Sequence, residues 1–246
     1  MPLAASRVFK QFKYAMYFDG VDDYVLVPDE RSLRPSAFTI FVFAWMSAPS
    51  QYQLQLFMKS GNAPGYTMTL EVNAPAYGSN VRYLISDVSS GAYYNKLYKG
   101  GVSQWFAPAL VYDGSKAYSY YNGALVASDS LSYDNTKNTN PIKIGFPFGT
   151  NPPDLISLVL YYSRPLSDSE IQQNCNYPDN PVRNGLVLWL KADPAYVKDI
   201  NNDGILEWID LSGFNNHGKI YGPQLVQLIK GASRVVQAQR VLPCAR

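Results

Sequence analysis

Residues 199–210, with the sequence DINNDGILEWID, have the spacing of oxygen ligands around a calcium ion. In such a loop, oxygen ligands occupy alternate positions around a hard cation, and a glycine at position six allows the sharp turn. Position twelve carries Asp instead of the usual bidentate Glu, and no helices are predicted to flank the loop. An Asx-rich surface turn is therefore the alternative interpretation. The predicted calcium ligands are Asp199, Asn201, Asp203, the carbonyl oxygen of Ile205, Glu207 and Asp210.

Tyrosines form a second set of residues with binding chemistry. A tyrosine ring can stack on a sugar and its hydroxyl can form a hydrogen bond, and tyrosine also suits protein interfaces. Several of the 20 tyrosines flank loops or alternate along expected strands. Half of each alternating set is expected in the core, and the sequence does not show which half. The predicted ligand-binding residues are Tyr93, Tyr94, Tyr98 and Tyr120.

Catalytic chemistry is poorly represented in the chain. Glycoside hydrolysis needs two carboxyl groups facing one groove, and of the four glutamates only Glu71 lies inside an expected strand. The single histidine, His217, has no nucleophile elbow around it and is interpreted as structural. The chain is therefore predicted not to be an enzyme.

The overall composition excludes several classes of partner. The chain has 246 residues, only 16% of them charged, and a formal net charge of +2. Such a balance gives no electrostatic basis for binding nucleic acid or a membrane surface.

The chain contains no run of about 18 apolar residues, so no transmembrane helix is predicted, and no secretory signal is visible at the N-terminus. The two cysteines allow one disulfide bond, between Cys175 and Cys244.

Short alternating apolar stretches, separated by polar turns, predict an all-β protein. The clearest hairpin signal is Asn122–Gly123. One short helix is expected to begin after Ser167, which forms a capping box with Glu170, and to end near Asn176. The predicted organisation is an N-terminal arm (1–13), a sandwich (14–176), further C-terminal strands (177–230) and a basic tail (231–246).

Five phrases in residues 14–175 resemble the laminin-G-like and pentraxin-like group of concanavalin A-like jelly rolls. The resemblance implies a jelly-roll β-sandwich that binds or has a structural role, without implying catalysis. The family commonly has two histidines where this chain has Phe106 and Ala107, and an Asp–Glu pair where it has Ser157 and Leu158. These departures put a family polar site near that strand in doubt. The phrases are FDGVDDYVLVP, FTIFVFAWM, Trp105, LVYDGSKAYSYYNGALVAS and LYYSRPLSDSEI.

Residues 185–222 resemble the segment that normally precedes the FDGVDDYV phrase, yet here they come last. The domain is therefore predicted to be circularly permuted, with its C-terminal strands completing the sandwich within the same chain. In one alternative, those strands are supplied to a neighbouring copy. In the other, they form a small separate module. The family resemblance also allows a structural cation at Asp19, Asp22 and Asp23, although turn chemistry is the favoured interpretation.

The phrase NPVRNGLVLWLKADP is similar to the tails of structural proteins of viruses that infect hyperthermophilic archaea. With the lectin-like fold, this resemblance implies a virion or extracellular structural or adhesive protein that recognises host-surface glycans. Its predicted partners are copies of itself or other virion proteins, with glycans as ligands and calcium as the cofactor. The predicted location is extracellular or on the virion surface. A secreted monomeric lectin is the alternative, and a glycoside hydrolase the least favoured.

Overall fold

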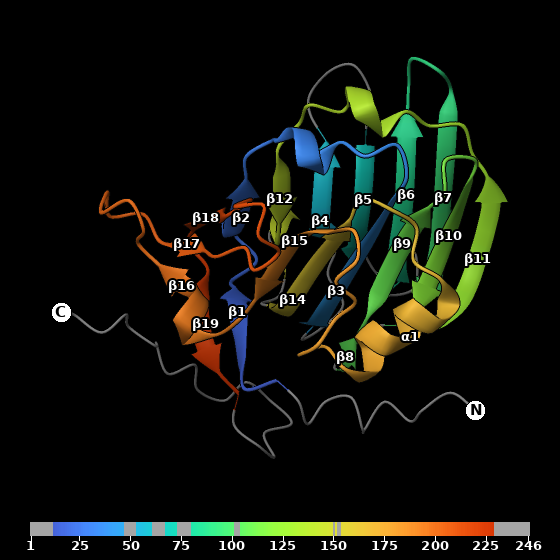
Figure 1. Ribbon diagram of the computed structural model, residues 1–246. Helices are drawn as coiled ribbons and strands as arrows, with labels where there is room; N and C mark the ends of the chain where they lie inside the picture. Colours follow the sequence, from blue (N-terminus) through green and yellow to red (C-terminus); the bar gives the residue numbers. More distant parts are fainter. Residues whose placement is uncertain are drawn as a thin grey trace.

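The computed structural model describes residues 12–46, 53–60, 67–72, 80–100, 104–149, 151 and 154–228. These residues form two antiparallel β-sheets packed face to face, here named sheet A and sheet B, with α1 against the outer side of sheet A (Figure 1). The prediction of a jelly-roll sandwich with one short helix is confirmed.

Sheet A is ordered β11 (Ala124–Ser130), β10 (Lys116–Tyr121), β9 (Pro108–Tyr112), β3 (Phe38–Met46), β14 (Asp154–Tyr162), β1 (Tyr14–Phe18) and β19 (Gln224–Gln227). In addition, β15 (Leu186–Lys191) pairs with β14, and β8 (Trp105–Phe106) pairs with β3. Sheet B is ordered β16 (Val197–Lys198), β17 (Glu207–Trp208), β18 (Gly218–Tyr221), β2 (Tyr24–Val27), β12 (Ile142–Ile144), β4 (Gln53–Ser60), β5 (Thr67–Val72), β6 (Asn80–Asp87) and β7 (Ala92–Lys99), and β13 (Phe146–Phe148) also pairs with β4. The helical segments are α1 (Asp168–Asn176) and the short 3-10 helices η2 (Arg31–Leu33), η4 (Asn135–Lys137) and η5 (Pro194–Tyr196).

Strands β3 and β14 are mainly apolar and buried along almost their whole length, because both faces of sheet A are covered. In β3, Phe38 and Ile40 point into the main core between the sheets, whereas Phe41 and Phe43 belong to a second cluster on the outer side. That second cluster also contains Ile171 of α1. Sheet B has no second apolar cluster of this kind among the described residues, so its outer face is left for polar and aromatic side chains.

The C-terminal strands pair with strands from the other end of the same chain. Strand β15 pairs with β14, β18 with β2, and β19 with β1. Their apolar side chains, such as Leu188, Leu190 and Trp208, lie in the main core. The predicted domain boundaries stay a prediction. Most of the predicted arm, the basic tail and Cys244 lie outside the described residues, and Cys175 is buried.

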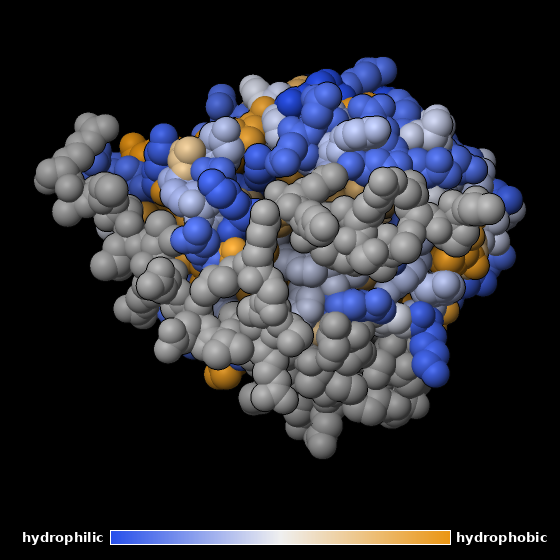
Figure 2. Space-filling view, turned by 90° about the horizontal axis from the view of Figure 1, so that it is seen from below, coloured by the Kyte–Doolittle hydropathy of each residue, from blue (hydrophilic) through white to orange (hydrophobic). Residues whose placement is uncertain are grey.

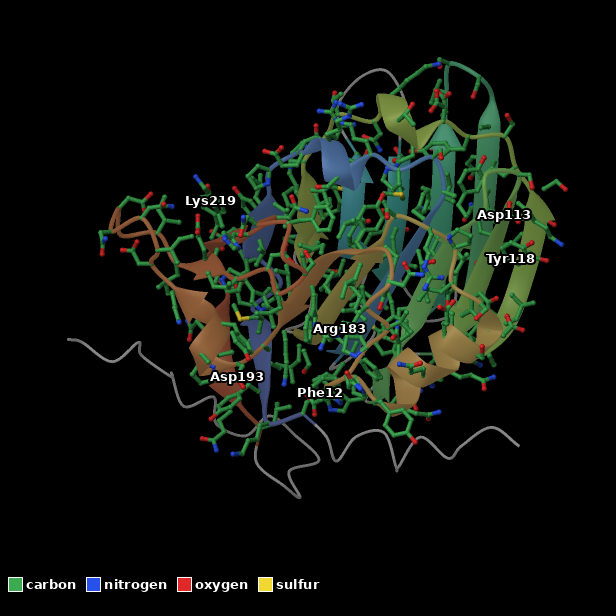
Figure 3. The ribbon with its side chains drawn as sticks, in the orientation of Figure 1. Phe12, Asp113, Tyr118, Arg183, Asp193 and Lys219 are labelled. Atoms are coloured by element: carbon green, nitrogen blue, oxygen red, sulfur yellow. The ribbon has the colours of Figure 1, made fainter. Side chains whose placement is uncertain are left out.

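Most of the described surface on the underside of the molecule is hydrophilic, and hydrophobic residues form small separate areas there (Figure 2). On the outer side of sheet A, Arg183 lies over the ring of Trp189, with 3.9 Å from Cζ to the ring centroid. Figure 3 shows Arg183 in front of this sheet. Such a cation–π contact covers the edge of the second cluster.

The start of α1 has the predicted capping box. The Glu170 N–H donates to Ser167 Oγ at 3.4 Å, and the Ser167 N–H donates to Glu170 Oε2 at 2.9 Å. Arg164 also donates two hydrogen bonds to this carboxylate, at 3.0 and 2.5 Å. These bonds, chiefly those from Arg164, lower the pKa of Glu170 from 4.5 to about 2.

We expect acid to weaken the protein partly through Glu170. Because its pKa is lower in the folded chain, its stabilising effect is complete above pH 4.5 and is lost as the pH falls from 4.5 towards 2. Chemical denaturation across this window should show a shallower loss of stability in Glu170→Gln than in the parent chain. Glu30→Gln, which removes an exposed carboxylate, is the control. Identical pH profiles for Glu170→Gln and the parent would contradict this role.

Candidate ligand-binding face

The outer face of sheet B brings together side chains from strands that are distant in sequence. Residues directly opposite each other in an antiparallel pair share a face, and successive residues of a strand alternate between faces. Gln55 of β4 lies opposite Glu71 of β5, which lies opposite Arg82 of β6. Phe146 of β13 also lies opposite Gln55. One continuous face therefore carries both aromatic and polar residues.

Four aromatic rings, here named the aromatic group, lie on one part of this face: Tyr24, Phe146, Phe148 and Tyr221. Tyr24 stacks on Tyr221 with 4.9 Å between ring centroids, and it meets Phe146 edge-on at 5.7 Å. Phe146 and Phe148 are 5.4 Å apart. Lys143 Nζ lies 4.2 Å from the centre of the Phe146 ring. Phe148 is 48% exposed and Tyr221 38% exposed, so the group offers ring surface to a ligand.

Hydrogen-bonded side chains, here named the polar row, continue across β4 to β7: Gln55, Glu71, Arg82, Asn95 and Tyr93. Glu71 accepts hydrogen bonds from Gln55 Nε2 at 2.5 Å and Arg82 Nη1 at 2.8 Å. Arg82 Nε donates to Asn95 Oδ1 at 2.9 Å, and Asn95 Nδ2 donates to the Tyr93 hydroxyl at 2.8 Å. Gln55 and Glu71 are buried, at 1% and 2% exposed, so they hold Arg82 in place, and Arg82, Asn95 and Tyr93 are the members of the row with exposed surface.

Two acceptors beside the polar row are buried and have no hydrogen-bond partner among the described residues: Gln55 Oε1 and Thr69 Oγ1. A buried polar atom without a partner costs about 1–3 kcal/mol, and such atoms mark places where a further hydrogen-bonding group is favoured. Gln55 also lies opposite Phe146 in register. The unpaired acceptor of Gln55 therefore lies where the aromatic group meets the polar row.

The four tyrosines predicted to bind a ligand divide into two pairs. Tyr93 is 64% exposed in the polar row, and Tyr98 is 38% exposed beside Tyr121. Tyr94 and Tyr120 are buried, which corrects the expectation that their rings are open to a sugar. Their hydroxyl groups bond Ser119 Oγ and Asp168 Oδ1, each at 2.6 Å. Burial raises the pKa of Tyr94 to about 12.

Sequence reasoning missed the aromatic group. Its rings come from β2, β13 and β18. The sequence of each strand, taken alone, does not indicate that the three strands bring their rings together. The usable signal was the phrase GFPFG at residues 145–149, in which two phenylalanines share one face of a short strand. Pairing of β13 with β4, and of β18 with β2, brings the rings together.

The acidic turn between β1 and β2 follows the favoured turn interpretation. Among the described residues, one group of three acidic side chains could hold a metal ion. It consists of Asp19, Asp22 and Asp23, whose carboxylate oxygens lie within 4.8 Å of one another. Asp23 Oδ2 accepts from the Asp19 N–H and Asp19 Oδ1 accepts from the Val21 N–H, both at 2.8 Å. Burial raises the pKa of Asp23. Whether this turn also holds a cation stays a prediction.

In the predicted calcium stretch, Asp210 is used elsewhere, which corrects its assignment as the ligand at position twelve. Its carboxylate accepts hydrogen bonds from the Trp189, Ser212 and Asn216 N–H groups and from Ser212 Oγ, at 2.7 to 3.0 Å. The Asp210 N–H donates to His217 Nδ1 at 3.0 Å, so His217 has the structural contact expected of it. These bonds join β15 to the turn that follows β17.

A family model described as the concanavalin A-like lectin/glucanases superfamily matches residues 19–172, more than half of the chain. The chain belongs to this superfamily. The superfamily match covers the expected sandwich and agrees with the observed two-sheet architecture. No curated protein matches the chain significantly in sequence.

Solved structures share the superfamily fold at low sequence identity. A proposed carbohydrate-binding protein from Bacteroides ovatus ATCC 8483 is 18% identical, with a TM-score of 0.65, and the match covers 88% of this chain and 60% of that protein. Domain 4 of the extracellular arabinanase AbnA from Geobacillus stearothermophilus, solved with arabinotriose, is 19% identical, with a TM-score of 0.50, covering 68% and 84%. The binding domain of botulinum neurotoxin serotype D is 14% identical, with a TM-score of 0.52, covering 87% and 62%. At these identities the likeness shows the fold alone.

Three further observations bear on membrane spanning and on catalysis. No helix among the described residues is long and apolar enough to span a membrane. In the polar row, Glu71 is the single carboxylate, and it is bonded to Arg82 and Gln55. Ser157 and Leu158, which replace the family's Asp–Glu pair, are fully buried in β14. The prediction that the chain is not an enzyme stays a prediction.

Proposed function

We propose that this chain is a non-enzymatic structural or adhesive protein that binds surface glycans through the outer face of sheet B. The observation that carries this proposal is that Phe146 of the aromatic group lies opposite Gln55 of the polar row, whose Oε1 has no hydrogen-bond partner among the described residues. A sugar presents an apolar C–H face and a rim of hydroxyl groups. Exposed aromatic rings suit the first, and fixed amide and guanidinium groups suit the second.

The proposed setting is extracellular or on the surface of a virion. The lectin-like fold supports the first, and the resemblance of NPVRNGLVLWLKADP to archaeal viral structural proteins supports the second. In a virion the partners are copies of this chain or other virion proteins. A secreted monomeric lectin is the alternative, and light scattering of the purified protein separates the two. A monomer at high concentration favours the lectin.

We expect Phe146→Ala and Phe148→Ala to weaken glycan binding by roughly fivefold each, because one ring contact contributes about 1 kcal/mol. A glycan array identifies the ligand, and titration calorimetry then measures its affinity. The control is Phe214→Ala, since Phe214 is also exposed, at 54%, but lies outside this face. Absence of any glycan ligand would contradict the proposed function. Equal losses for Phe146→Ala and Phe214→Ala would exclude this face as the site.

A further inference from the structure

Lys143 lies in β12, among the central strands of sheet B, and is directed away from the core. Its neighbours along the strand, Ile142 and Ile144, belong to the main core, and successive residues of a strand alternate between faces. Lys143 is therefore on the outer face that carries the aromatic group and the polar row. The residue is partly exposed. A positive charge thus lies within the candidate ligand-binding face, with surface open to solvent.

The residues paired with Lys143 across the sheet are apolar. They are Leu26 on β2 and Met58 on β4. One strand further on each side lie Lys219, opposite Leu26, and Thr69, opposite Met58. This row of five residues therefore has two positive charges and no carboxylate. Among the ion pairs of the described residues, none includes Lys143.

Two aromatic rings lie close to the ammonium group of Lys143. Its Nζ is 4.2 Å from the centre of the Phe146 ring and 6.0 Å from that of Tyr24. A ring attracts a cation through its quadrupole but supplies no negative charge. The rings also displace water, and an ion pair is stronger where the effective dielectric constant is lower. Lys143 is thus suited to pair with an anion that arrives from solvent.

The other positive groups of this face have carboxylates of their own. Arg82 forms an ion pair with Glu71 at 2.8 Å, so this carboxylate is already compensated. Lys219 of β18 (Figure 3) lies opposite Glu207 of β17. Lys143 differs from both, because its partners on the two adjacent strands are apolar. It is therefore the cation of this face that an incoming anion can use at the least cost.

We propose that the glycan bound by this face is acidic, and that Lys143 pairs with its carboxylate or sulfate group. This inference rests on the proposed function and specifies the class of its ligand. An ammonium group and an anionic oxygen form a charge-assisted hydrogen bond. With that group on Lys143, the C–H face of the same sugar can lie on Phe146, whose ring is next to the ammonium group. A neutral glycan leaves the charge of Lys143 unused, so the face discriminates by charge.

An array of carboxylated and sulfated glycans, each printed beside its methyl ester or its desulfated form, tests the proposal. Titration calorimetry then measures the best acidic ligand and its neutral form. We expect the acidic form to bind about tenfold more tightly, because a hydrogen bond to a charged group contributes more than a neutral one. Raising sodium chloride from about 0.05 to about 0.5 M should weaken binding of the acidic form and leave the neutral form nearly unchanged.

Lys143→Met should lower the affinity for the acidic form by about tenfold and remove its advantage over the neutral form. Lys143→Arg keeps the positive charge and should keep the advantage. The matched control is Lys116→Met. Lys116 Nζ also lies over an aromatic ring, 5.2 Å from the centre of the Tyr118 ring, but on β10 of sheet A. This control should change the affinity for neither form.

Equal binding of the acidic and neutral forms would overturn this inference and leave the proposed function standing. An acidic advantage that survives in Lys143→Met, or is lost equally in Lys116→Met, would overturn it as well. Absence of any glycan ligand would instead remove the proposed function on which the inference rests. If Lys143→Met does not fold, the comparison of the two forms on the parent chain, with its salt dependence, still decides the question.

Discussion

Replacing Asp29 with Asn is expected to lower the free energy of unfolding by about 3–5 kcal/mol. Lys59 is completely buried, and its Nζ contacts Asp29 Oδ1 at 2.6 Å and the Asn140 carbonyl oxygen at 2.5 Å. Arg34 forms an ion pair with the same carboxylate. Without Asp29, the ammonium group of Lys59 stays buried without a counter-charge, and an uncompensated buried charge strongly destabilises the folded state.

Urea denaturation measures this effect, and Asp129→Asn is its matched control. Asp129 forms an ion pair with Lys96, but its side chain is 54% exposed, so its loss should cost at most about 1 kcal/mol. Burial alone would raise the pKa of Asp29, but hydrogen bonds from Arg34 and Lys59 outweigh it and lower that pKa below 3.8. The stabilisation is therefore present above pH 3.8 and lost under stronger acid. Similar losses for the two variants would contradict the role of the buried pair.

Trp208→Ala is expected to lower the free energy of unfolding by about 3–5 kcal/mol, the usual range for deleting a large buried ring. Trp208 of β17 is fully buried in the main core, and its Nε1 donates to the Lys191 carbonyl oxygen at 2.8 Å. The cost arises from the cavity and from the lost hydrogen bond. Tyr177→Ala, at a position 64% exposed, is the control and should change stability little.

The same experiment separates closure of the sandwich within one chain from exchange of strands between copies. If β15 to β19 complete their own chain, the urea midpoint of the parent should not change across a 100-fold range of protein concentration. If they pair with a neighbouring copy, dilution should lower the midpoint, because association contributes to stability. A midpoint that falls on dilution would therefore favour the alternative of strand exchange.

The fold was largely predictable because its signals are local. Alternating apolar residues predicted the strands, and Ser167 with Glu170 predicted the start of α1. Strand β14 consists mainly of apolar residues and pairs with β3, β1 and β15. In each of these cases, the residues that determine the element lie next to one another in the sequence.

The candidate sites were predicted less completely. Spacing in the sequence predicted Asp199, Asn201, Asp203 and Glu207 as calcium ligands, and this stays a prediction. It misassigned Asp210, whose carboxylate bonds the Trp189 N–H, 21 residues away in the chain. A spacing rule carries no information about partners at such a distance.

By itself, the sequence determined the class of fold, the helix cap and the low charge of the chain. These follow from backbone periodicity, capping chemistry and composition. Only the tertiary structure decided that Tyr94 and Tyr120 are buried while Tyr93 is exposed, and that Tyr24, Phe146 and Tyr221 meet on one face. The physical reason is that strand pairing sets which residues are neighbours across a sheet. Packing of the second sheet then sets which face of each strand is buried.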